Sequence, residues 1–123
     1  MAFKYSSAFV TIAAKDLNSA IAFYRELLQQ DPQPLIPEVY AEFNLQGLRL
    51  GIFQPKKNNQ SEFDNPTGSG MSICIEVDDI EEAIAHLTKI GSPPKGKIMT
   101  ASHGKEIYAS DRDGNRLILH QSI

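Results

Sequence analysis

The stretch DLNSAIAFYRELL, at residues 16–28, decides the fold because its pattern returns 63 residues later as DIEEAIAHL at residues 79–87. In each copy an Asp precedes apolar residues that recur at helical spacing, so this Asp is predicted to cap a helix. Apolar, β-branched residues at 8–13 and 71–77 predict a buried strand before each helix. The same strand–helix unit is therefore expected twice.

A second internal match lies near the end of each half. GLRLGIFQ at residues 47–54 aligns with GNRLILHQ at residues 114–121, which is 67 residues later. Two matches in the same order indicate a duplicated supersecondary unit. We therefore predict a single α+β domain, residues 1–123, with module 1 at about 5–56, a polar linker at about 57–69 and module 2 at about 70–123. Further strands are predicted at 39–45, 48–54, 98–99, 106–110 and 116–121.

Strand parity separates the two faces of each predicted sheet, because successive side chains point to opposite faces. Leu50 and Ile52, with their counterparts Leu117 and Leu119, are expected to pack beneath the helices. The opposite face is mixed in polarity, which is typical of a curved sheet whose concave side lines a pocket. That face is predicted to hold Phe9, Thr11, Arg49, Gly51, Phe53, Ser72, Cys74, Glu76, Arg116, Ile118 and His120.

Composition argues against several classes of function. The net charge is −3 and the longest basic run is Lys56-Lys57, whereas nucleic-acid binding needs a cationic surface to neutralise phosphates. No stretch approaches the ~18 apolar residues of a membrane span, and residues 1–7 lack the apolar segment of a secretory signal. The lone Cys74 excludes an internal disulfide and indicates a reducing compartment, so we expect a cytoplasmic protein.

Three stretches carry a family resemblance. VTI at residues 10–12 followed by the first helix, IEVDDIEEAIAHL at 75–87, and SDRDGNRLILHQ at 110–121 resemble the vicinal oxygen chelate superfamily. This group contains glyoxalase I, extradiol dioxygenases, fosfomycin-resistance transferases and bleomycin-resistance proteins. The resemblance covers essentially the whole chain. It implies two βαβββ modules that form an eight-stranded, incompletely closed barrel or cup (the glyoxalase/bleomycin-resistance fold), commonly in a homodimer.

The resemblance also implies four positions at which metal-dependent members place His, Glu or Gln ligands. Here those positions hold Phe9, Gly51, Ser72 and Ile118. Divalent ions need lone-pair donors in fixed geometry, whereas three of these residues offer no side-chain donor and serine offers only a weak one. We therefore expect no metal at the usual site and no other cofactor.

Histidines are the next candidates for chemistry. His120 lies two residues beyond Ile118 on the same predicted face, so it is expected to reach the cavity. Imidazole suits proton transfer near neutral pH, which would make it a ligand contact or a general base. Otherwise it is a lining residue satisfied by a neighbour. His86 and His103 are expected to be exposed, and no two histidines have the spacing of a metal-binding motif.

For several other residues the sequence supports both a functional and a purely structural interpretation. Tyr108 precedes the last turn, where several relatives of the superfamily place an aromatic residue against substrate, and Glu106 shares its parity. Arg49 and Arg116 occupy equivalent positions of the repeat; they are either an anion clamp or solvated residues at strand ends. Cys74 is interpreted as a small apolar filler, because no nearby cation in the sequence would activate its thiol.

The leading hypothesis is a metal-independent small-molecule binding protein of the bleomycin-resistance type. Its ligand, with an apolar or aromatic part, would lie in the cup formed across the two modules or across a homodimer interface. The second hypothesis is an enzyme of the same superfamily (a lyase, isomerase or dioxygenase) that uses His120 with Glu106 or Tyr108, or a displaced metal site. The third is a dimeric accessory or regulatory scaffold whose cup is plugged. The candidate ligand-binding residues are Phe9, Thr11, Phe53, Ser72, Cys74, Tyr108, Ile118 and His120.

Overall fold

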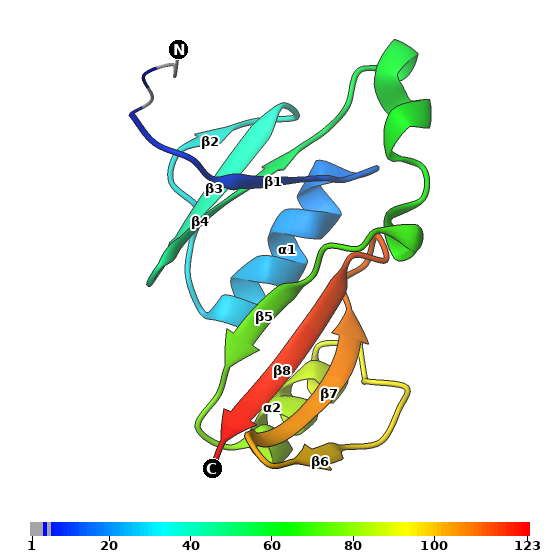
Figure 1. Ribbon diagram of the computed structural model, residues 1–123. Coiled ribbons are helices and arrows are strands. Elements are labelled where there is room, and N and C mark those ends of the chain that lie inside the picture. The colour runs from blue at the N-terminus through cyan, green and yellow to red at the C-terminus, as the bar shows by residue number, and fades with distance from the viewer. Residues whose placement is uncertain (1–3, 5) are drawn as a thin grey trace.

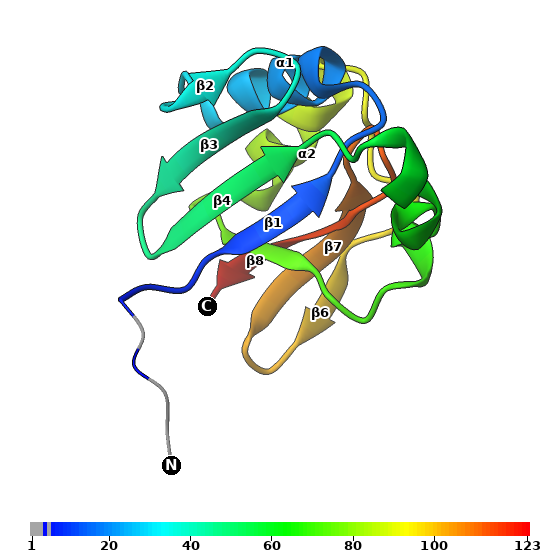
Figure 2. The same cartoon turned by 90° about the horizontal axis from the view of Figure 1, so that it is seen from above.

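The computed structural model describes Lys4 and residues 6–123, so residue 5, the expected start of module 1, lies outside the described residues. Within these residues eight strands form two four-stranded sheets, and helices α1 and α2 lie on the same side of them (Figures 1 and 2). The first half contains β1 (Val10–Ala13), α1 (Leu17–Leu28), β2 (Leu35–Ile36), β3 (Tyr40–Leu45) and β4 (Leu48–Phe53). The second contains β5 (Ile73–Glu76), α2 (Ile80–Lys89), β6 (Met99–Ala101), β7 (Gly104–Ser110) and β8 (Arg116–Ser122).

Both sheets have the same topology. Their strand orders are β1-β4-β3-β2 and β5-β8-β7-β6, and in each the first strand is parallel to the last strand of its half. Val10 pairs with Leu50 in the first sheet, and their repeat counterparts Ile73 and Leu117 pair in the second. The duplication therefore extends to strand register. The sheets do not close into a barrel, so the expectation of two βαβββ modules in an open cup is confirmed.

Side chains on the helix-facing side of each sheet build the core. Leu50, Ile52, Leu117 and Leu119 are buried, as strand parity predicts. Burying apolar area contributes about 25 cal/mol per Å², so this face supplies much of the drive to fold. The helices contribute Leu17, Ala20, Ile21, Phe23, Tyr24, Ile80 and Leu87 to the same core.

Each helix begins with two side-chain caps. Asp16 Oδ1 accepts the Ser19 N–H, and Asp79 Oδ1 accepts the N–H groups of Glu81 and Glu82. Gln54 and Gln121, at equivalent positions of the repeat, add a second acceptor from the end of β4 and from β8. Gln54 Oε1 accepts the Leu17 N–H at 2.9 Å, and Gln121 Oε1 accepts the Ile80 N–H at 2.8 Å. These bonds satisfy amides that a helix start leaves without partners.

Most predicted strands differ from the observed ones by one or two residues at an end, and the larger differences are as follows. The short strand β2 was not predicted, since Leu35 and Ile36 lie among prolines and form only two pairs with β3. Strand β6 begins at Met99 rather than residue 98, and β7 begins at Gly104 rather than residue 106. The stretch predicted as a linker contains two 3₁₀ helices, η1 (Lys57–Phe63) and η2 (Pro66–Gly68). Among the described residues, neither helix has the length and apolar character needed to cross a membrane.

Candidate functional site

A pocket of about 530 Å³ lies between the edge strands β1 and β5 and the segment that joins the two halves. Figure 1 shows this segment, in green, looping beside the end of β1 and the start of β8. A volume of this size lies within the range of about 300–1,000 Å³ that small-molecule sites occupy. The lining comprises residues 10–13, Leu48, residues 61–66, Ser69, residues 71–74, Asn115 and Arg116.

Three of the eight predicted ligand-binding residues line this pocket: Thr11, Ser72 and Cys74. Phe53 borders it indirectly, because its ring packs edge-to-face at 5.1 Å against Phe63, which is part of the lining. The segment predicted as a linker therefore also supplies a wall of the pocket. Sequence reasoning missed this role because residues 54–70 show no periodicity that would indicate which side chains point inward.

Arg116 is fixed at one side of the pocket. Its Nε donates a 2.6 Å hydrogen bond to Ser72 Oγ, and its Nη2 donates to the Ser69 carbonyl at 3.1 Å. Arg49, its counterpart in the repeat, lies over the ring of Phe9, with 3.9 Å between the guanidinium carbon and the ring centroid. The two arginines thus contact different partners, and each is half-buried rather than solvated at a strand end.

The four positions at which the resemblance implied metal ligands do not fit a metal. Guanidinium groups already contact two of them, Phe9 and Ser72, and bring positive charge where a cation would have to bind. Gly51 is covered by the ring of Tyr40, whose Cε1 lies 2.8 Å from the place a Cβ would occupy. Burial, followed by the hydrogen bond to Glu42, raises the pKa of Tyr40 to about 12, so this phenol stays protonated. The fourth position, Ile118, has no donor atom.

Tyr108, Ile118 and His120 are not among the residues that line the pocket. They lie on the face of the second sheet opposite α2, where Ile118 pairs in register with the lining residue Cys74. The eight predicted residues are therefore not gathered in one site. Thr11, Ser72 and Cys74 share the pocket, Phe9 and Phe53 border the first sheet's open face, and the other three share the open face of the second sheet. Their role in ligand binding stays a prediction.

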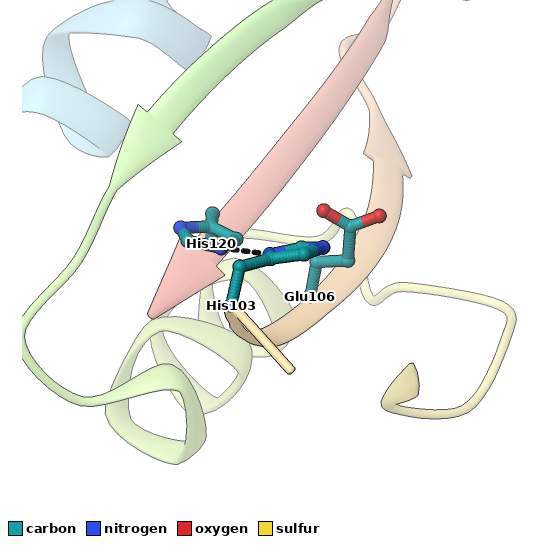
Figure 3. Close-up of side chains that lie close together, drawn as sticks. All are labelled: His103, Glu106 and His120. Carbon is teal, nitrogen blue, oxygen red and sulfur yellow. Dashed lines mark hydrogen bonds between the residues drawn. The ribbon is translucent and has the colours of Figure 1, made fainter. Parts of the chain in front are cut away.

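His120 contacts two further polar side chains. Its Nδ1 is hydrogen-bonded to Glu76 Oε1, and its Nε2 lies 2.9 Å from His103 Nδ1 (Figure 3). The bond from His120, with a second from Ser122, lowers the pKa of Glu76. Parity had assigned Glu76 to this face, but His103 was expected only to be exposed. It is exposed, yet the β6–β7 turn brings it onto His120, a contact that sequence spacing does not reveal.

The thiol of Cys74 is exposed at the pocket wall. Partial burial, together with the negative charges of Glu76 and Glu106, raises its pKa. The interpretation of an unactivated thiol therefore agrees with its surroundings, although the residue faces the pocket rather than filling the core.

Comparison with known proteins agrees with this architecture. The family model described as Glyoxalase/Bleomycin resistance protein/Dioxygenase superfamily matches residues 7–119. No protein with a curated functional description matches the chain in sequence.

Three solved structures of the same fold each share about a fifth of their residues with this chain. A bleomycin-binding protein complexed with bleomycin is 20% identical with a TM-score of 0.68, covering 97% of this chain and 100% of its own. A lactoylglutathione lyase from Agrobacterium tumefaciens is 20% identical with a TM-score of 0.70, covering 95% and 94%. A glyoxalase / bleomycin resistance protein from Catenulispora acidiphila is 21% identical with a TM-score of 0.69, covering 94% and 97%. At these identities the likeness shows the fold alone.

Proposed function

The chain belongs to the Glyoxalase/Bleomycin resistance protein/Dioxygenase superfamily, and from this premise we propose that it is a metal-independent small-molecule binding protein of the bleomycin-resistance type. One observation carries the proposal: a pocket of about 530 Å³ lies beside family positions that hold arginine contacts in place of metal donors. A scaffold with a plugged cup would lack such a pocket. The bleomycin complex of one structural relative is a second, weaker support.

The lining suggests the chemical class of the ligand. Val10, Ile12, Phe63 and Met71 offer apolar surface for a ring or an aliphatic group. About half of the lining residues are polar or charged, with Arg116 as a cation and Glu62 and Asp64 as carboxylates. Sites of this kind bind the apolar body of a ligand by burial and orient it through a small number of hydrogen bonds. We therefore expect an aromatic or aliphatic ligand that carries one polar substituent, or an anionic one that binds beside Arg116.

The fluorescent probe 8-anilinonaphthalene-1-sulfonate tests this class, because it combines aromatic rings with a single sulfonate. Titration into the untagged protein is expected to give saturable fluorescence with one probe per chain. Cys74→Trp, which places a large side chain in the pocket, is expected to weaken binding at least about tenfold, since each 1.4 kcal/mol of lost contact is a factor of ten. Ala85→Trp, at an exposed position of α2, adds the same side chain away from the pocket and serves as the control.

Two outcomes would overturn the pocket assignment. One is non-saturable binding that both tryptophan variants leave unchanged. The other is loss of binding in Tyr108→Ala and His120→Ala with full binding in Cys74→Trp, which would move the ligand to the open face of the second sheet.

We also propose that the protein is a homodimer in the cytoplasm. The support for dimerisation is apolar surface on the open sheet faces, where Phe9, Tyr108 and Met99 are each more than 40% exposed. Contiguous exposed apolar surface commonly marks an association site. Light scattering after gel filtration is expected to give twice the chain mass of 13.6 kDa, and a monomer at all concentrations would contradict it.

The cytoplasmic location rests on the lone Cys74, a usage typical of reducing compartments.

A further inference from the structure

A row of polar side chains crosses the second sheet outside the pocket. Glu76 on β5 pairs in register with His120 on β8, and His120 pairs with Glu106 on β7. Residues in register on adjacent strands present their side chains to the same face, so this face holds carboxylate, imidazole and carboxylate side by side. His103, from the turn that joins β6 to β7, lies against the same row (Figure 3).

Backbone geometry explains the position of His103. The next residue, Gly104, has φ +143°, and a Cβ there would collide with the carbonyl of Gln121. Only glycine allows the turn to approach β8 this closely. The imidazole rings of His103 and His120 consequently lie 5.1 Å apart at an interplanar angle of 24°.

The hydrogen bonds of His120 fix which nitrogen offers a lone pair. Its Nδ1 faces the carboxylate of Glu76, which can only accept, so Nδ1 carries the hydrogen. Its Nε2 then directs a lone pair at His103 Nδ1, 2.9 Å away. Without a further ion, the two facing nitrogens share one hydrogen. A cation between the two nitrogens would displace the hydrogen from His103 Nδ1. That hydrogen would move to Nε2 of the same ring, so the total number of protons would not change.

We propose that His103, Glu106 and His120 bind a divalent cation of the Zn²⁺ class, with Glu76 as the positioning carboxylate. One donor atom from each of the three residues lies within 4.8 Å of the others. Zn²⁺ bound to nitrogens at about 2.0–2.1 Å in tetrahedral geometry holds them about 3.3 Å apart. The two nitrogens, now 2.9 Å apart, would separate by about 0.4 Å, and the rings would tilt so that both lone pairs point at the ion. The carboxylate of Glu106, on the neighbouring strand β7, would complete the donor set by side-chain rotation.

The donor set selects the class of ion. Two imidazoles and one carboxylate suit Zn²⁺, Ni²⁺ or Co²⁺, whereas Ca²⁺ and Mg²⁺ prefer an all-oxygen shell. Ligating histidines commonly donate their second ring N–H to a carboxylate, which fixes the ring and strengthens the ligand. Glu76 has this relation to His120 and is itself held by Ser122, whose Oγ donates to Oε2 at 2.9 Å.

This site differs from the family's metal positions and from the pocket, although His120 is also one of the predicted ligand-binding residues. It uses none of Phe9, Gly51, Ser72 and Ile118, the positions where a metal was expected from the resemblance. None of its three ligands lines the pocket. The failure of the pocket proposal would therefore leave this one standing, and the reverse also holds.

The test is calorimetric titration of untagged, chelator-treated protein with Zn²⁺, followed by desalting and elemental analysis. We expect close to one Zn²⁺ per chain and little heat with Mg²⁺. His103→Gln, His120→Gln and Glu106→Gln are each expected to weaken binding at least about tenfold, and Glu76→Gln by about 10–100-fold although it removes no ligand. His86→Gln is the control, because this histidine lies on α2 and contacts the Glu26 carbonyl at 2.7 Å.

Circular dichroism on each variant checks that it is folded, and the probe fluorescence described above gives an independent readout of the pocket. Equal loss in His86→Gln, Zn²⁺ far below one per chain, or affinity unchanged in both His103→Gln and His120→Gln would overturn the proposal. Because none of the three ligands lines the pocket, the ligand variants are expected to keep their probe affinity while they lose Zn²⁺.

Discussion

The phenol of Tyr24 donates a 2.6 Å hydrogen bond to Oδ2 of Asp111, joining helix α1 of the first half to the turn before β8 of the second. Both residues are buried. Asp111 also accepts the N–H groups of Asp113 and Asn115 at 2.9 Å each, so one carboxylate both shapes the turn and receives the phenol. The two sheets are thereby connected through a buried polar contact as well as through apolar packing.

Removing the hydroxyl group of Tyr24 should lower the free energy of unfolding without changing the shape of the core. Tyr24→Phe is expected to reduce the free energy of unfolding by about 1.5–3 kcal/mol, the usual value of a hydrogen bond to a charged group. Urea denaturation followed by circular dichroism measures this. Tyr108→Phe, at a side chain that is 48% exposed, is the matched control and should stay within about 0.5 kcal/mol of the wild type. Equal stability of Tyr24→Phe and the wild type would mean that the bond contributes nothing.

The same phenol predicts how stability changes in alkali. Burial, with the charge of Asp111, raises the pKa of Tyr24 well above its ordinary value of 10.0. Above the ordinary value the unfolded chain releases the phenolic proton, whereas the folded chain keeps it. The unfolded state then binds fewer protons, so the free energy of unfolding falls as pH rises. Unfolding free energies measured from pH 8 to 11 should decline above about pH 10, and the decline should be smaller in Tyr24→Phe. Parallel curves for the two proteins would contradict this assignment.

The sequence predicted the repeat, both helices, the core face and the absence of donors at Phe9, Gly51 and Ile118, because all of these follow from periodicity and residue type. It did not predict the Tyr24–Asp111 bond, since the partners are 87 positions apart and no local pattern links them. The contact of His103 with His120 was missed for a related reason: it depends on the path of a turn. Pocket walls built by residues 61–66 likewise depend on tertiary packing, which no local pattern encodes.

Gln54 and Gln121, which cap the two helices, should contribute equally to the free energy of unfolding if the two halves are equivalent in energy as well as in geometry. Gln54→Leu and Gln121→Leu each remove the acceptor of a helix-start amide, so each is expected to cost about 1 kcal/mol. The caps belong to different helices and share no partner, so the double variant should lose about the sum. Thermal and urea unfolding of the three variants test this, and a double variant no worse than either single one would show that the caps are coupled.

Substitutions at Gly51 and Tyr40 should have non-additive effects on the free energy of unfolding. A methyl group at residue 51 would meet the Tyr40 ring, with Cε1 at 2.8 Å, so Gly51→Ala is expected to destabilise the protein by about 1–3 kcal/mol. Truncation of the ring in Tyr40→Ala makes room, so the double variant should lose less than the sum of the two single variants. Strict additivity in the double-mutant cycle would show that the ring does not cover this position.

Cys74 provides a chemical readout of both its own environment and the pocket. Because the pKa of the thiol is raised above its ordinary value of 9.0, little thiolate is present at neutral pH, and thiolate is the reactive form. Alkylation by iodoacetamide, followed by mass spectrometry, should therefore be slow at pH 7 and keep accelerating beyond pH 9, with Cys74→Ser as the blank for other modified residues. A rate that reaches its plateau below pH 8 would instead identify an activated thiolate.

Since the thiol lines the pocket, saturating 8-anilinonaphthalene-1-sulfonate should slow the reaction at a fixed pH. Full reactivity in the presence of bound probe would place the probe elsewhere on the protein.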